Sequence, residues 1–225
     1  MLFRSVIDVA RLVAGPPSVN GSLGLEQAVY AYGSSGNIHP AAYLASLRFF
    51  QELKDQNKLV AFSVVRNAFE DFLVKHKPFI NALGHTKGSR TRPLEAILQM
   101  YRIVFAAVHR SEPESDIINQ LQKDPTLSKA ILSVVPVDGT EPIRRRFSAV
   151  AVKTKLVDEV LNTRPRCSIC GARLPPSYRS KDHIEKKENE GMGNAENLRF
   201  THPYCNHSRD SIEAARERNA SQSQE

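Results

Sequence analysis

Three cysteines and one histidine in the C-terminal quarter of the chain have the spacing of a metal site. Two residues separate Cys167 from Cys170, and the same gap separates His202 from Cys205. Two residues of separation let both side chains reach one tetrahedral ion from a tight turn, which Gly171 would help to close. We therefore predict a structural zinc ion (Zn2+) held by three thiolates and one imidazole.

The cysteine count agrees with metal binding rather than disulfide bonding. The chain has three cysteines, all within the pattern above, whereas a secreted disulfide framework needs an even number spread through the fold. The apolar N-terminal segment 1–17 is interrupted by Asp8 and Arg11, which an export signal would not carry. No run of 18 apolar residues occurs. We expect a cytoplasmic protein with no membrane partner.

The residues between the two cysteine pairs could carry hydrolytic chemistry. Asp182 and His183 are adjacent, Asn197 follows fourteen residues after His183, and Asn206 follows nine residues later. The carboxylate of Asp182 and the amide oxygen of Asn206 suit a hard divalent cation. The imidazole of His183 can be a neutral base near pH 7, and Asn197 could hold it in position. The alternative is that Asp182 and His183 are a surface pair in a charged loop.

Taken together, the segment resembles the HNH endonuclease family in its zinc-knuckle form. The resemblance depends on Cys167-x2-Cys170, Asp182-His183-Ile184, Gly191, Gly193, Asn197-Leu198, His202-x2-Cys205-Asn206 and Arg209. It implies a ββα-metal fold, with a first strand that ends near His183 and a helix that begins around Tyr204.

The resemblance also implies a role for each residue. Asp182 and Asn206 would hold one Mg2+ or Mn2+ ion, and His183 would deprotonate the attacking water. Asn197 would steady the loop that orients His183, and Arg209 would contact a phosphate near the start of the helix. The expected products carry 5′-phosphate and 3′-hydroxyl ends.

The sequence departs from the family pattern at several positions. His202 stands where a cysteine is usual, and Met192 separates two glycines that are usually adjacent. Glu185 and Lys186 occupy positions where proline is common, so we expect a loop of different shape. His207 is an alternative to Asn206 as the second ligand of the catalytic ion.

The charge of the chain suits a nucleic-acid partner. The net charge is +7, and basic residues gather in 75–92 and in 144–166. Solvated helix faces would explain either stretch, but the second adjoins the cysteine region, where it could follow a phosphate backbone. We expect double-stranded DNA as the partner. The candidate contacts are Arg209, Arg199, Lys181, Arg144, Arg145 and Arg146.

The first 162 residues are predicted to be mostly helical. Apolar residues recur at helical spacing in 1–17, 40–58, 59–84, 92–111, 114–123, 126–135 and 144–163. Segment 22–40 is either a helix or a strand flanked by turns. The expected fold is therefore mainly α, with a helical domain (1–162), a small ββα-metal HNH module (163–219) and a tail (220–225).

A second resemblance concerns the whole chain. Segment 21–44, the helices after it and the HNH module are similar to the C-terminal half of GmrSD-like restriction proteins. This implies a role in restriction or phage defence. The N-terminal motif of those proteins is not seen, so we expect a fragment or a partner subunit that supplies sensing. Cleavage of both strands would need a homodimer, because one active site meets one strand. The alternative function is a zinc-stabilised nucleic-acid-binding module without nuclease activity.

Overall fold

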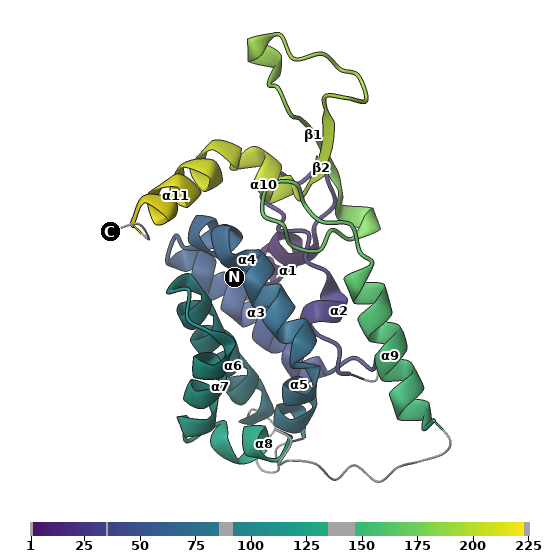
Figure 1. The fold of residues 1–225 in the computed structure, drawn as a ribbon, viewed down its shortest axis with the longest axis vertical. Helices are drawn as coiled ribbons and strands as arrows, with labels where there is room; N and C mark the ends of the chain where they lie inside the picture. Colours follow the sequence, from purple (N-terminus) through teal and green to yellow (C-terminus); the bar gives the residue numbers. More distant parts are fainter. Residues whose placement is uncertain (1, 35, 86–91, 135–146, 223–225) are drawn as a thin grey trace. The chain divides into compact units, whose positions relative to one another are not determined.

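The computed structural model describes residues 2–34, 36–85, 92–134 and 147–222 (Figure 1). This part of the chain contains eleven α-helices, two short 3-10 helices and one two-stranded sheet. The sheet lies near the C-terminus beside the cysteine cluster. The predicted fold class, mainly α with a small ββα module, is confirmed. None of the helices described is long and apolar enough to cross a membrane.

Contacts along the chain define two compact units. We call them the knuckle unit, which contains Met1–Glu26, Phe50–Ala68 and Arg164–Glu225, and the helical unit, which contains Gln27–Phe49 and Phe69–Thr163. Two helices, α3 (Pro40–Asp55) and α4 (Leu59–Lys75), contribute residues to both units. The division into a helical domain (1–162) and a nuclease module (163–219) remains a prediction.

The other helices of the helical unit are α2 (Gln27–Tyr30), α5 (Lys77–Gly84), α6 (Arg92–His109), α7 (Glu114–Lys123), α8 (Ser128–Leu132) and α9 (Ala149–Asn162). Aromatic rings fill the core of this unit. Phe49 stacks on Phe69 with ring centroids 5.6 Å apart, and Tyr101 packs against both. The apolar periodicity located α6 and α7, because the residues that they bury are apolar. The predicted segment 59–84 divides into α4 and α5.

Helix boundaries follow proline and capping residues. Pro78 lies in the first turn of α5, where its missing N–H costs no helical hydrogen bond. Helix α9 begins later than residue 144, because the hydroxyl of Ser148 accepts from the backbone N–H of Ala151 and caps the helix. Segment 22–40 combines the short helix α2 with an isolated β-bridge between Tyr32 and Ile38.

One basic residue of segment 75–92 has an unexpected role. Lys77 is buried, and its ammonium donates hydrogen bonds to the carbonyls of Ala28, Val29 and Tyr32. These carbonyls lie at the C-terminal end of α2, where backbone acceptors lack helical partners. The interpretation of this segment as a solvated basic face is therefore wrong for Lys77.

The knuckle unit begins with α1 (Leu2–Ala14) and continues, after parts of α3 and α4, with η1 (Pro176–Tyr178), β1 (Ser180–His183), η2 (Lys187–Asn189), β2 (Leu198–Thr201), α10 (Pro203–His207) and α11 (Arg209–Gln222). Strands β1 and β2 are antiparallel, with Asp182 opposite Arg199 and His183 opposite Leu198. As expected, the first strand ends at His183 and the next helix begins one residue before Tyr204.

The core of the knuckle unit surrounds the cysteine pairs. Its buried members are Cys167, Ile169, Cys170, Ala172, Leu174, Cys205 and Ile212. The N-terminal segment joins this core through its backbone, because the N–H of Tyr204 donates to the carbonyl of Ser22 at 2.8 Å. Arg66 of α4 is fully buried and donates to the carbonyl of Leu23, also at 2.8 Å. Residues distant in sequence therefore support the metal-binding segment.

Candidate metal centre and active site

The four predicted zinc ligands converge in the structure. The ligand atoms of Cys167, Cys170, His202 and Cys205 all lie within 4.8 Å of one another, and all four residues are buried. Nδ1 of His202 is 3.4 Å from Sγ of Cys170 and 3.7 Å from Sγ of Cys205. A tetrahedral zinc ion with ordinary bond lengths places nitrogen and sulfur about 3.6 Å apart. The cluster therefore fits a zinc ion.

Local backbone geometry forms each half of the cluster. Gly171 has a φ of 75°, a left-handed conformation that suits glycine. This turn lets the Gly171 N–H donate to the carbonyl of Cys167 at 2.8 Å. The other pair is placed by α10, because His202 is its N-cap residue and Cys205 lies in its first turn.

The histidine ligand is oriented by a backbone acceptor. Nε2 of His202 lies 2.9 Å from the carbonyl oxygen of Arg173. A carbonyl can only accept, so Nε2 carries the proton and Nδ1 faces the thiolates. Such a partner fixes the ring orientation of a metal-binding histidine and increases its basicity.

The ligands shift one another's pKa values in opposite directions, and hydrogen bonds with Cys167 and Cys170 raise the pKa of the Cys205 thiol. Hydrogen bonds from Cys170 and Cys205 lower the pKa of the Cys167 thiol far below its usual range. Burial and the charge of Arg66 lower the pKa of His202, but the neighbouring sulfurs outweigh both and raise it to about 9.

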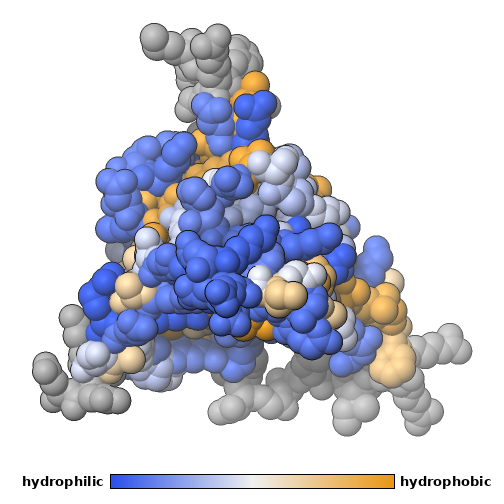
Figure 2. All heavy atoms as spheres, turned by 90° about the horizontal axis from the view of Figure 1, so that it is seen from above, coloured by the Kyte–Doolittle hydropathy of each residue, from blue (hydrophilic) through white to orange (hydrophobic). Residues whose placement is uncertain are grey.

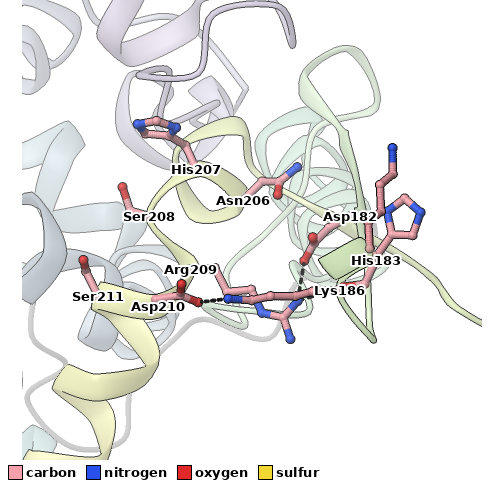
Figure 3. A pocket seen from close by; sticks show the side chains of 10 residues that line it. Asp182, His183, Lys186, Asn206, His207, Ser208, Arg209, Asp210 and Ser211 are labelled. Atoms are coloured by element: carbon pink, nitrogen blue, oxygen red, sulfur yellow. Dashed lines mark hydrogen bonds and ion pairs between the residues drawn. The ribbon is translucent and has the colours of Figure 1, made fainter. Parts of the chain in front are cut away.

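A second site lies in a pocket of about 390 Å3 between β1 and the two C-terminal helices (Figure 3). Its lining residues are Asp182, His183, Lys186, Lys187, Asn206, His207, Ser208, Arg209, Asp210 and Ser211. Three of the four predicted catalytic residues, Asp182, His183 and Asn206, thus share one pocket. The fourth, Asn197, lines an adjoining hollow of about 400 Å3 together with Asp182 and His183.

Asp182 is held by two arginines. Its Oδ2 accepts from Nε of Arg199 at 2.7 Å and lies 3.8 Å from a terminal nitrogen of Arg209. Both ion pairs reach the same oxygen, which leaves Oδ1 for a cation. The neighbouring charges fix the carboxylate in place, and they also oppose the approach of a cation. A cation at Oδ1 would have to overcome this repulsion.

The amide of Asn206 is oriented by its own donors. Its Nδ2 donates to the hydroxyl of Ser180 at 2.9 Å and to the carbonyl of Lys181 at 3.0 Å. Because the carbonyl can only accept, the nitrogen must face β1, and the amide oxygen remains for a ligand. In Figure 3 this oxygen is turned toward the Asp182 carboxylate, whereas the ring of His207 points away from it. The geometry favours Asn206 over His207 as a cation ligand.

His183 is half-buried at the end of β1 and lines both hollows. Arg209 fixes this strand end, because its guanidinium donates to the carbonyls of His183 at 2.8 Å and Ile184 at 2.9 Å. The imidazole is therefore carried by backbone that is bound to the start of α11. A phosphate contact of Arg209 remains a prediction.

Asn197 ties the loop after His183 to the start of β2. Its Oδ1 accepts from the N–H of Glu185 at 2.7 Å, and its Nδ2 donates to the carbonyls of Glu185 at 3.0 Å and Met192 at 2.8 Å. The loop also approaches itself closely at Gly191, where a Cβ atom would lie 1.9 Å from the carbonyl oxygen of Glu185. Gly191 is therefore needed at its position for a steric reason, although Met192 separates it from Gly193.

Replacing Asn197 with alanine should loosen this loop without removing the zinc cluster. The change removes three hydrogen bonds, each worth about 1 kcal/mol, so we expect faster amide hydrogen exchange in segment 184–196. Asn189→Ala, in the same loop, is the matched control and should leave exchange unchanged. Unaltered exchange in the Asn197→Ala protein would show that these hydrogen bonds do not hold the loop.

The predicted nucleic-acid contacts lie in different surroundings. Lys181 is exposed on β1, opposite Phe200 of β2. Arg199 binds the Asp182 carboxylate rather than projecting into solvent. Arg144, Arg145 and Arg146 lie outside the residues that the structure describes.

Three features of the site were missed by sequence reasoning. Ser180 orients Asn206, and strand alternation could have found it, since residues two apart share a face with Asp182. The carbonyl of Arg173 orients His202, and no pattern of side-chain types indicates such a backbone acceptor. Lys186 binds Asp210 at 2.6 Å at the pocket edge; this hydrogen bond raises the pKa of Lys186 and lowers that of Asp210.

No protein-family model, no curated protein and no solved structure matches this chain. What the structure itself supports is a buried Cys3His cluster, suited to zinc, within a two-stranded sheet followed by a helix. Any more specific assignment must come from the chemistry of the neighbouring pocket.

Proposed function

We propose that this chain is a divalent-metal-dependent endonuclease of the HNH type, which hydrolyses phosphodiester bonds in DNA. The observation that supports this most directly is the shared pocket of Asp182, His183 and Asn206. It joins a carboxylate, a free amide oxygen and an imidazole beside a cluster that stiffens the backbone carrying them. A zinc-stabilised binding module has no need of that combination.

Each residue has a distinct part in the proposed reaction. Asp182 and Asn206 hold Mg2+ or Mn2+, which supplies Lewis-acid stabilisation of the charge that develops on the phosphate and the leaving 3′ oxygen. His183 accepts a proton from the attacking water. Asn197 keeps the loop beside His183 in one conformation, and Arg209 keeps the strand end in register.

The cationic side chains around the pocket suit an anionic substrate. Lys186, Lys187 and Arg209 line it, and the exposed Lys181 lies on the adjacent strand. A phosphodiester backbone placed there would offset the repulsion between these charges and the divalent ion. We propose double-stranded DNA as the substrate and restriction of foreign DNA as the biological role.

Plasmid cleavage distinguishes the nuclease from a binding module. Supercoiled plasmid is incubated with the zinc-loaded protein in the presence of no added divalent ion, Ca2+, Mg2+ or Mn2+. We expect nicked or linear product with Mg2+ or Mn2+, and no product with Ca2+ or without an added divalent ion. An RNA substrate of matched length tests the choice of nucleic acid. Binding without cleavage under every condition would support the alternative function.

Two carboxylates of the pocket provide a matched pair for the same assay. Asp182→Asn should lower cleavage by about 10²-fold or more, because a neutral amide holds the cation less well and no longer balances Arg199. Asp210→Asn changes a carboxylate in the same pocket that binds Lys186 instead, and should leave most activity. Equal losses in both variants would argue against a specific cation ligand at Asp182.

A further inference from the structure

The sheet of β1 and β2 has a buried face and an exposed face. Asp182 and Thr201 belong to the buried face. Side chains alternate along each strand, and the register places two further pairs of residues on the other side of the sheet. We call this side the outer face, and its residues are Lys181, His183, Leu198 and Phe200.

Two large apolar side chains of the outer face are exposed. Leu198 and Phe200 have exposed fractions of 39 and 40%. The solvent face of an antiparallel sheet normally carries polar residues, and the molecular surface drawn in Figure 2 is mostly hydrophilic in colour. Exposed apolar side chains that stand singly need no explanation, so the meaning of this pair depends on its neighbours.

Cations accompany the exposed apolar pair. The guanidinium carbon of Arg179 lies over the Phe200 ring, 5.4 Å from its centroid, and the exposed Lys181 is opposite Phe200 in the register. Proteins bind unpaired nucleotides with this combination, because an aromatic ring stacks on a base while positive charges contact the phosphates. An apolar protein surface would instead bury both charges without a partner. The chemistry of the outer face therefore favours nucleic acid.

The outer face continues into the hollow of about 400 Å3 that adjoins the cation pocket. Lys181 and Leu198 line this hollow, whose volume is within the usual range for ligand sites. Among the described residues that line it, Asp182 is the only acid, and Arg199 already binds that carboxylate. Asp182 and His183 line both cavities. A strand whose phosphate lies in the cation pocket therefore has its neighbouring nucleoside at the hollow.

We propose that the outer face and the adjoining hollow bind an unstacked nucleobase of the cleaved strand. The substrate is then DNA with a short unpaired segment beside the scissile bond, a preference that rests on the proposed nuclease function and narrows its substrate. Bases of an intact duplex are stacked and paired, so their faces are not accessible to a protein side chain. In this site Phe200 and Leu198 contact the faces of unpaired bases, and Arg179 and Lys181 contact the flanking phosphates.

DNA binding by the zinc-loaded protein is measured apart from cleavage, with Ca2+ in place of Mg2+ and two duplexes that differ only in a short central unpaired segment. We expect the unpaired form to bind about 10-fold more tightly, the scale of stacking one base on one aromatic ring. Phe200→Ala should remove most of this preference, and Leu198→Ala should reduce it. Phe147→Ala and Leu132→Ala are the matched controls, because they shorten exposed side chains of the helical unit, and both should keep the preference.

Tryptophan fluorescence can report the stacking itself. The chain contains no tryptophan, so Phe200→Trp introduces a single indole on the outer face. This variant should keep the binding preference, because an indole ring also stacks on a base. DNA with the unpaired segment should quench its emission strongly, and the fully paired duplex should not. Zinc content, measured for every variant, identifies any that fails to fold.

The nucleobase site and the nuclease activity can fail separately. Equal affinity of the parent for the two duplexes, or a folded Phe200→Ala protein with the parent's preference, would overturn the site even if plasmid is cleaved. A parent that prefers the unpaired segment through Phe200 but cleaves nothing would support the site and contradict the nuclease. A parent that binds neither duplex would overturn the site as well.

Discussion

Replacing His183 with alanine is expected to lower the rate of plasmid cleavage by about 10²–10⁴-fold, the usual contribution of a general base. The side chain lines the pocket with Asp182 and Asn206, but it contributes no ligand to the zinc cluster. The variant should therefore retain its zinc content, its melting temperature and its affinity for DNA. The measurement is the initial nicking rate with saturating Mg2+.

His207→Ala is the matched control for this variant. His207 lines the same pocket, yet its ring points away from the Asp182 carboxylate (Figure 3). It should retain cleavage within a few-fold of the parent. Added imidazole should partly restore activity to His183→Ala, because a small base can enter the vacated space. If His207→Ala loses activity and His183→Ala does not, the base has been assigned to the wrong residue.

Replacing Cys205 with serine is expected to unfold the knuckle unit. A hydroxyl is a poor substitute for a thiolate, and binding energy at a structural zinc site is folding energy, about 10–16 kcal/mol for zinc-finger peptides. Zinc content should fall well below one ion per chain. Amide exchange in β1, β2 and α10 should become fast, and cleavage should be lost together with the fold.

Ser168→Ala provides the control, since Ser168 lies between two of the ligands and is exposed. It should bind zinc and melt like the parent. Removing zinc from the parent with a chelator should reproduce the Cys205→Ser phenotype, and adding zinc back should reverse it. A Cys205→Ser protein that melts like the parent would show that the cluster does not hold the fold together.

The cysteine cluster could be predicted because its chemistry is local. Two residues between ligands suit one turn, whether the turn is closed by Gly171 or forms the start of α10. Helices such as α6 and α7 were found for a similar reason, since a single apolar face is visible in sequence. Ligand spacing and helical periodicity are both patterns of neighbouring residues, so each can be recognised without knowing which distant residues pack nearby.

Features that depend on distant residues could not be predicted in this way. Arg66 and Leu23 are joined by a hydrogen bond that brings the N-terminal segment into the knuckle unit, and no spacing rule connects them. A lysine in a basic stretch is expected at the surface, whereas the ammonium of Lys77 donates to buried backbone carbonyls. The contact between Arg199 and Asp182 required the register of β1 against β2.

The residues of the candidate catalytic site could be proposed from their side-chain chemistry and from the family resemblance, but their convergence could not. Asp182 and Asn206 lie 24 positions apart, and what brings them into one pocket is the packing of β1 against α10. Hydrogen bonds from Asn206 to Ser180 and Lys181 then decide which atom of the amide faces the pocket. Such orientation depends on strand pairing and on the acceptor role of a carbonyl, and neither is encoded by residue type alone.

The central claim is that two cations have separate sites in this chain, one bound by sulfur and one by oxygen. Anomalous diffraction at the zinc and manganese edges, from crystals grown with Mn2+, tests it directly. We expect a zinc peak among Cys167, Cys170, His202 and Cys205, and a manganese peak between the side-chain oxygens of Asp182 and Asn206. A manganese concentration that supports cleavage but leaves no peak between those oxygens would contradict it.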